Sequence, residues 1–153
     1  MKKTIGILTI VSTIYLMVAC NAGPEKKLIG SWKLDSFQIT NIDELVNKSL
    51  EAAPDSLKDS LRQANQATYE AMQKVEISMN LKEDLTYEML IAGQTEPEKG
   101  TWKISEDGKT FTTKVDGAEV DNPYVVSELT DIKLSCEGED DGMKMKFSYS
   151  KTQ

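Results

Sequence analysis

The chain has 153 residues, enough for one domain, with 18 basic residues, 25 acidic residues and a formal net charge of −7. An acidic chain of this kind is a poor ligand for nucleic acid and for direct adsorption to anionic lipid. It contains no histidine, which excludes histidine-based catalytic triads, most zinc sites and the usual pH switch.

The N-terminus predicts an export signal over residues 1–19. Lys2 and Lys3 precede an uncharged, mostly apolar run that ends at Ala19, which is typical of a secretory leader. The run is too short for a comfortable membrane span of roughly 20 apolar residues. Met17-Val18-Ala19-Cys20 resembles the lipobox of bacterial lipoproteins. That resemblance implies cleavage before Cys20 and lipidation of its thiol; the alternative is an ordinary leader with a chance cysteine.

Cleavage has three consequences. It removes two lysines and changes the net charge from −7 to −9. Export implies an oxidising compartment, yet Cys136 is left without a cysteine partner, so the domain depends on its hydrophobic core. Residues 20–27 are polar with Gly and Pro and predict a flexible tether. The segment after Cys20 has no acidic cluster of the kind that surface-exposed lipoproteins carry, so we expect the periplasmic face of the outer membrane, with surface exposure left open.

Most of residues 28–153 alternates between apolar and polar side chains. Runs near residues 75–81, 85–91, 102–104, 111–115, 124–129, 132–136 and 143–149 show the period of two, and turn residues separate them. This pattern is typical of antiparallel strands with one face in a core. With 28–39 as the first strand, the sequence predicts a mainly β fold, an eight-stranded antiparallel up-and-down barrel.

A helical insertion is predicted between the first and second strands, over about 41–74. Asn41 and Glu44 have the spacing of a capping box, and Pro54 suits the first turn of a second helix. An apolar stripe follows at helical spacing: Leu57, Leu61, Ala64, Thr68 and Met72. Because the stripe is narrow, we expect this helix to lie against the domain without filling its core.

Two Gly-x-Trp elements suggest a family. Gly30-Ser31-Trp32 opens the first strand, and Gly100-Thr101-Trp102 opens a later one. Together with Thr130-Asp131 before the seventh strand, they resemble the lipocalins, and in particular the small lipocalin-like domain lipoproteins of Bacteroidota, over residues 28–150. Lipocalins commonly lay an arginine from the last strand over the first tryptophan. The only arginine is Arg62, in the insertion, so we expect the stacked arginine to be missing, and a lysine such as Lys146 does not reproduce a stacked guanidinium.

The connections predict a closed floor and an elaborated mouth. Short turns at 82–84, 106–108 and 130–131 would gather at one end. The insertion and the loops 93–99, 116–123 and 137–142 would gather at the other, with the insertion where lipocalins carry a lid. This asymmetry suits a cup for a ligand, but side chains can also fill an eight-stranded barrel. Both interpretations stay open.

Catalysis and cofactor binding are not expected. Cys136 has no histidine partner and lies on an apolar strand face, so we interpret it as a buried small hydrophobe. The acidic segment 137–142 does not have calcium-loop spacing and predicts a hairpin turn. No phosphate-binding glycine loop is present. The sequence therefore predicts no enzyme, no cofactor and no metal site.

Ligand binding is the first functional hypothesis. Six side chains are expected to face inward and to give an apolar, adaptable lining: Tyr87, Met89, Phe111, Met143, Met145 and Tyr149. Acidic mouth loops would disfavour anions such as fatty acids and tolerate neutral or cationic amphiphiles, unless they serve only solubility. The alternative function is a non-catalytic interaction module with a filled barrel, which docks a partner through its acidic loops or helical face.

Overall fold

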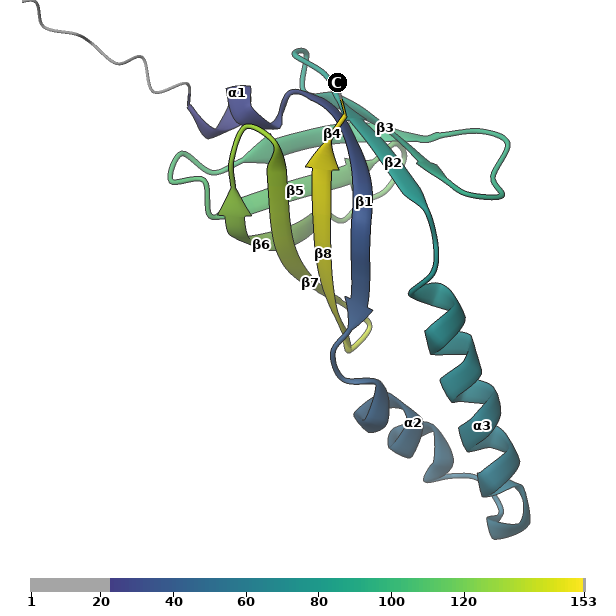
Figure 1. Cartoon of the computed structure of the whole chain (residues 1–153). Helices are drawn as coiled ribbons and strands as arrows, with labels where there is room; N and C mark the ends of the chain where they lie inside the picture. The colour runs from purple at the N-terminus through teal and green to yellow at the C-terminus, as the bar shows by residue number, and fades with distance from the viewer. Residues whose placement is uncertain (1–22, 153) are drawn as a thin grey trace, which may run out of the picture.

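A computed structural model describes residues 23–152; the predicted leader and Cys20 lie outside these residues. Eight strands form a closed barrel in which each strand pairs antiparallel with the next and β8 pairs with β1 (Figure 1). The strands are β1 Gly30–Ile39, β2 Ile77–Leu81, β3 Thr86–Ile91, β4 Glu98–Ile104, β5 Thr110–Val115, β6 Asn122–Leu129, β7 Lys133–Asp140 and β8 Met143–Lys151. The predicted up-and-down barrel, with a helical insertion between its first two strands, is confirmed.

The register of β1 contains one irregularity. Pairing with β8 shifts between Leu34 and Ser36, so the side chains of Leu34 and Phe37 both face the core although three positions separate them. A bulge of this kind inserts an extra residue and bends the strand. It explains why simple alternation does not identify Phe37 and Ile39 as core residues.

The expected tether is partly wrong, because residues 24–28 form a short helix, α1 Pro24–Leu28. Proline suits the first helical turn. The decisive contact is apolar: Leu28 is 0% exposed and belongs to the barrel core. The indole Nε1 of Trp32 donates a hydrogen bond of 2.7 Å to the Leu28 carbonyl. The helix therefore plugs one end of the barrel, hereafter the floor.

Lys151, the last residue of β8, places a cation over the ring of Trp32. Its ammonium lies 5.1 Å from the Trp32 ring centroid and donates a 2.8 Å hydrogen bond to the Lys27 carbonyl. A cation over an indole face is a favourable contact. No arginine occupies this place, and the lysine over the ring is Lys151, not Lys146; its ammonium makes both the ring contact and the bond to α1.

Each of the two Gly-x-Trp elements requires glycine for a different steric reason. Gly30 adopts φ +131, a region that L side chains rarely occupy. Gly100 lies where a Cβ would stand 2.1 Å from the Lys114 carbonyl oxygen and 2.7 Å from the Tyr87 ring. Absence of a side chain at Gly100 lets the Tyr87 ring lie flat against β4.

The insertion consists of α2 Ile42–Leu50 and α3 Asp55–Met72. The two helices pack on each other and extend beyond the barrel at the end opposite α1 (Figure 1). Only their base touches the core, through Ile42, Leu45 and Tyr69. The expectation that the stripe lies against the domain was therefore wrong: Leu57 is 51% exposed and Leu61 38%.

The expected capping box is also absent. Asn41 makes no side-chain cap to α2. Its amide instead donates to the Gly142 carbonyl at 2.9 Å, and its Oδ1 accepts from the Lys144 amide at 3.0 Å, which ties the start of the insertion to the β7–β8 hairpin. Among the helices of the described residues, none has the length and apolar character needed to cross a membrane.

Candidate ligand site at the barrel mouth

The end of the barrel opposite α1, hereafter the mouth, is surrounded by the connections between β1 and β2, β3 and β4, β5 and β6, and β7 and β8. Three are long, as expected. The fourth is not: β7 continues to Asp140, and a two-residue turn of Asp141 and Gly142, both at positive φ, leads into β8. This is the hairpin turn that favours Asp-Gly, so 137–142 is a strand and a turn, not a loop over the mouth.

An aromatic belt follows the inner wall from β4 to β1. Ring centroids lie 6.4 Å apart for Trp102 and Phe111, 6.1 Å for Phe111 and Tyr124, 5.8 Å for Tyr124 and Phe147, and 5.1 Å for Phe147 and Phe37. Such separations are favourable for aromatic pairs. The belt packs with Leu28 and Tyr149 in one continuous core. The belt and the residues around Leu28 therefore form one packed core inside the barrel.

The belt depends on Gly138 of β7. A Cβ there would lie 2.6 Å from the Tyr124 ring. Because this position is empty, Tyr124 on β6 can cross β7 and meet Phe147 on β8 edge-on, at an interplanar angle of 85°. The role of Gly138 is not predictable from the sequence, because nothing in the alternation marks a glycine as a place for a neighbouring ring.

All six predicted lining residues face the core, but at two levels. Phe111, Tyr149 and Tyr87 are buried at 3%, 7% and 2% exposure. Met89, Met143 and Met145 are only partly buried and pack on the edge of the core. Their strand positions place them nearer the mouth: Met143 is the first residue of β8, and Met89 pairs with Glu98, the first residue of β4. These three methionines form the accessible part of the predicted lining.

A polar pair stands beside the methionines. The Tyr87 hydroxyl donates a 2.8 Å hydrogen bond to Glu98 Oε1. Burial raises the pKa of Tyr87, and the carboxylates of Glu98 and Asp116 raise it further. Burial is also the largest cause of the raised pKa of Tyr124, and Glu98 and Asp140 act in the same direction. Burial and the nearby carboxylates therefore disfavour ionisation of both hydroxyls. Both stay protonated and able to donate a hydrogen bond at neutral pH.

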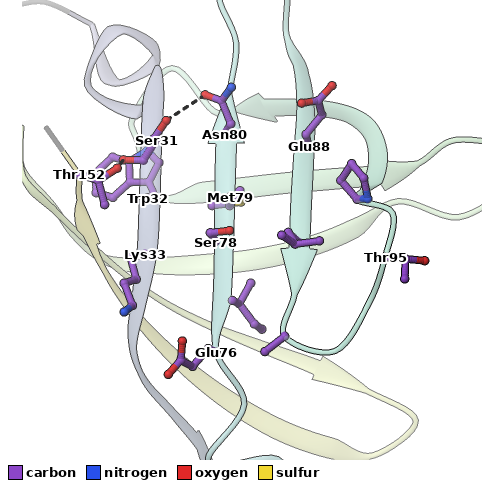
Figure 2. A pocket seen from close by; sticks show the side chains of 14 residues that line it. Ser31, Trp32, Lys33, Glu76, Ser78, Met79, Asn80, Glu88, Thr95 and Thr152 are labelled. Carbon is purple, nitrogen blue, oxygen red and sulfur yellow. Dashed lines mark hydrogen bonds between the residues drawn. The ribbon is translucent and has the colours of Figure 1, made fainter.

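Hollows at the described surface open on the outer side of the barrel wall and beside the base of α3. One, of about 670 Å³, extends over the outer faces of β1, β2 and β3. Figure 2 shows Ser31, Lys33 and Ser78 around it. Asn80 lies beside Ser31, and Glu88 is held by Lys82 at 2.9 Å. This hollow combines apolar side chains, such as Leu90 and Ile77, with charged ones of both signs, and it contains none of the six predicted lining residues.

Cys136 and the acidic residues have no catalytic arrangement. Burial raises the pKa of the Cys136 thiol from its usual value near 9 to about 12, and its side chain is 2% exposed; the interpretation as a buried hydrophobe fits this geometry. Across residues 23–152, no group of three or more acidic or cysteine side chains is arranged to hold a metal ion.

A closed eight-stranded meander with its first tryptophan under a cation from the last strand defines an up-and-down barrel of the lipocalin type. The chain belongs to the lipocalin-like domain family, whose sequence model matches residues 28–136.

Solved structures with a related fold have low identity. A protein from Bacteroides uniformis is 16% identical, with a TM-score of 0.47, covering 84% of this chain and 92% of its own. A DUF4847 family protein from Bacteroides vulgatus is 14% identical, with a TM-score of 0.42, covering 81% and 94%. Fatty-acid-binding protein 1 of Echinococcus granulosus is 9% identical, with a TM-score of 0.43, covering 84% and 99%. Among curated proteins, none matches the sequence.

Proposed function

We propose that this protein is a lipid-anchored binding protein of the cell envelope that holds a small apolar or amphipathic ligand at the mouth of its barrel. The observation that carries this proposal is the contrast inside the barrel: Met89, Met143 and Met145 are left partly accessible above a filled aromatic core. Methionine is flexible and polarizable and adapts to apolar guests. Membership in the lipocalin-like domain family supports the same function.

The filled floor limits the ligand. Phe111 and Tyr149 are part of the packed core, so they act as the base of the site and do not line an open cup. A guest inserts one apolar chain or ring among the methionines and leaves its polar end outside. We infer this from the continuous core under the methionines, because protein interiors are close-packed.

The carboxylates at the mouth determine which polar headgroup the ligand can carry. Glu98 is bonded to the Tyr87 hydroxyl, and Asp116 and Asp140 act on the same region. Carboxylates at a partly desolvated opening repel an anionic headgroup and attract a cationic one. The ligand is therefore a neutral or cationic amphiphile and not a free fatty acid.

Binding is tested with the neutral fluorescent probe N-phenyl-1-naphthylamine. We expect micromolar binding to the soluble domain, loss of binding in Met143→Asp and Met145→Asp, and no change in Met72→Asp, an exposed methionine of α3. Displacement by dodecyltrimethylammonium should exceed displacement by laurate. Glu98→Gln should reduce that preference several-fold, whereas Glu96→Gln in the neighbouring loop should not. Absence of probe binding to the folded wild type would refute the ligand site.

The anchor is proposed at Cys20, with the mature protein on the periplasmic face of the outer membrane. Labelled palmitate should be incorporated into the full chain and not into Cys20→Ala, which should leave the membrane fraction. Density separation of the membranes and protease treatment of intact cells then distinguish the outer from the inner membrane and the periplasmic face from the cell surface. Labelling of Cys20→Ala equal to wild type would contradict this anchor.

The second candidate is an interaction module, which the exposed apolar face of α3 favours. Leu57 and Leu61 remain exposed although both helices are formed. A stoichiometric partner recovered with the anchored protein and lost in Leu57→Asp and Leu61→Asp, together with no probe binding at the mouth, would favour this function over ligand binding.

A further inference from the structure

Two large apolar side chains are exposed at the floor. Ile132 stands at the tip of the β6–β7 turn and is 72% exposed, and Leu85 ends the β2–β3 turn at 38% exposed. Both turns lie at the end of the barrel that α1 closes (Figure 1). Lys151 of β8 bonds to the Lys27 carbonyl at the same end. The amide of Lys151 donates to the Ile132 carbonyl at 2.9 Å, so the β6–β7 tip is fixed to the same end as α1.

Leu85 adopts an unusual backbone conformation. Its φ is +64, a left-handed region in which glycine or asparagine is far less strained than a bulky residue. The turn is well made, since its amide donates to Lys82 and its carbonyl accepts from the Trp102 amide at 2.8 Å. A leucine at a strained and exposed turn position is therefore not explained by the turn itself, and strain of this kind is a reason to look for an outside contact.

The chain that leaves the floor is short. The helix α1 is held by the buried side chain of Leu28 and by the bond from Lys151 to the Lys27 carbonyl. Only residues 21–23 separate Pro24 from Cys20. At about 3.5 Å per residue, this segment reaches no more than about 14 Å, so a lipid on Cys20 brings the floor, and not the mouth, close to the membrane.

We propose that the floor is a docking surface for the phospholipid bilayer, with Ile132 and Leu85 entering the interface and with the mouth and the α2–α3 hairpin facing away. This orientation rests on the proposed lipidation of Cys20. Turn residues at the floor carry both signs of charge, with Glu106 and Asp107 near Lys109 and Asp131 near Lys133. The contact is therefore apolar and depends on the anchor, not on attraction to anionic lipid.

The experiment compares two single-cysteine reporters in the full, lipidated chain. Ile132→Cys at the floor and Val120→Cys in the β5–β6 loop are matched, because both native side chains are 72% exposed. Each is labelled with the environment-sensitive fluorophore NBD. Cys20 carries the lipid and Cys136 is buried, so the introduced thiol is the reactive one. The proteins are reconstituted into phosphatidylcholine vesicles with or without bromine on the acyl chains.

We expect brominated lipid to quench the fluorophore at 132 at least three-fold more than the one at 120. Equal quenching, or stronger quenching at 120, would overturn the orientation. Flotation of the vesicles separates this outcome from failure of the anchor: wild type should float and Cys20→Ala should not. If the wild type floats but the fluorophore of Ile132→Cys is not quenched, only the docking surface is refuted. If the wild type does not float, the anchor and the orientation are refuted together.

Discussion

The floor and the mouth of this barrel are built from the same strands but by opposite means. At the floor, turns are short, Leu28 and Trp32 are almost fully buried, and Lys151 joins the last strand to α1. At the mouth, connections are longer and the inward side chains are flexible methionines that stay partly exposed. Stability is therefore concentrated at one end, which leaves the other free to vary, as binding regions carried by a rigid scaffold generally are.

The largest effect on stability is expected for a substitution at Gly100 in β4, where neighbouring atoms approach the backbone closely. A methyl group there would meet the Lys114 carbonyl oxygen at 2.1 Å, so Gly100→Ala should destabilise the fold by about 3 kcal/mol or more. Gly23→Ala is the control, because nothing lies within 4 Å of its added Cβ, and it should change stability by at most about 1 kcal/mol. Urea unfolding measures both; equal values would contradict the close approach of the Tyr87 ring.

A direct comparison of the two ends uses Leu28→Ala and Met143→Ala. Removing the fully buried Leu28 side chain should lower the free energy of unfolding by about 2–5 kcal/mol. Truncating the partly exposed Met143 should lower it by about 1 kcal/mol or less while weakening probe binding. If Met143→Ala is the more destabilising variant, the division between a stabilising floor and a free mouth is wrong.

The Lys151 contact is expected to be worth about 1–2 kcal/mol. Lys151→Met keeps an apolar stem over Trp32 but loses the charge and the bond to the Lys27 carbonyl, and Lys151→Arg should recover part of the loss. Lys146→Met is the control, since it removes only an exposed ion pair with Glu137 and should change stability by less than about 0.5 kcal/mol. Thermal unfolding of the three variants gives the ranking; a Lys151→Met protein as stable as Lys146→Met would contradict it.

The smallest effect concerns Cys136 and emerges only at high pH. Because burial raises the pKa of its thiol from near 9 to about 12, its contribution to stability is complete below pH 9 and is lost as the pH rises above it. The unfolding free energy should therefore fall from pH 8 to pH 10, and Cys136→Ala should fall less. A thiol reagent should label Cys136 slowly in the native protein and rapidly in urea; fast native labelling would show that the interior is open.

The parts of the fold that sequence reasoning predicts correctly are those with local periodicity. Alternation identifies the strands from 75 to 149, and turn lengths identify the two ends, because both signals lie within a few neighbouring residues. The family resemblance adds the barrel closure, through Trp32 and Trp102. All six proposed lining residues face inward for the same reason.

The features that the sequence does not reveal depend on distant contacts or on one buried atom group. Residues 24–28 have the composition of a linker, yet burial of Leu28 makes them a helix. Lys151 and Lys27 are 124 positions apart in the sequence. No local pattern predicts that this lysine lies over Trp32, where lipocalins commonly have an arginine. Gly138 and the bulge after Leu34 decide where Tyr124 and Phe37 lie, and each acts through a neighbouring strand. The projection of α3 is equally hidden, because an amphipathic stripe does not say which partner covers it.

The attachment of α1 to the floor also gives the molecule a mechanical property. A pull on the N-terminus reaches the barrel through the buried Leu28 side chain and the Lys27–Lys151 bond before it reaches β1. The strand itself is flanked by β2 and β8, so the load is divided between two hydrogen-bonded neighbours. Force on an anchor is thus absorbed at the filled end, and the shape of the mouth is isolated from movements of the surface to which the chain is tied.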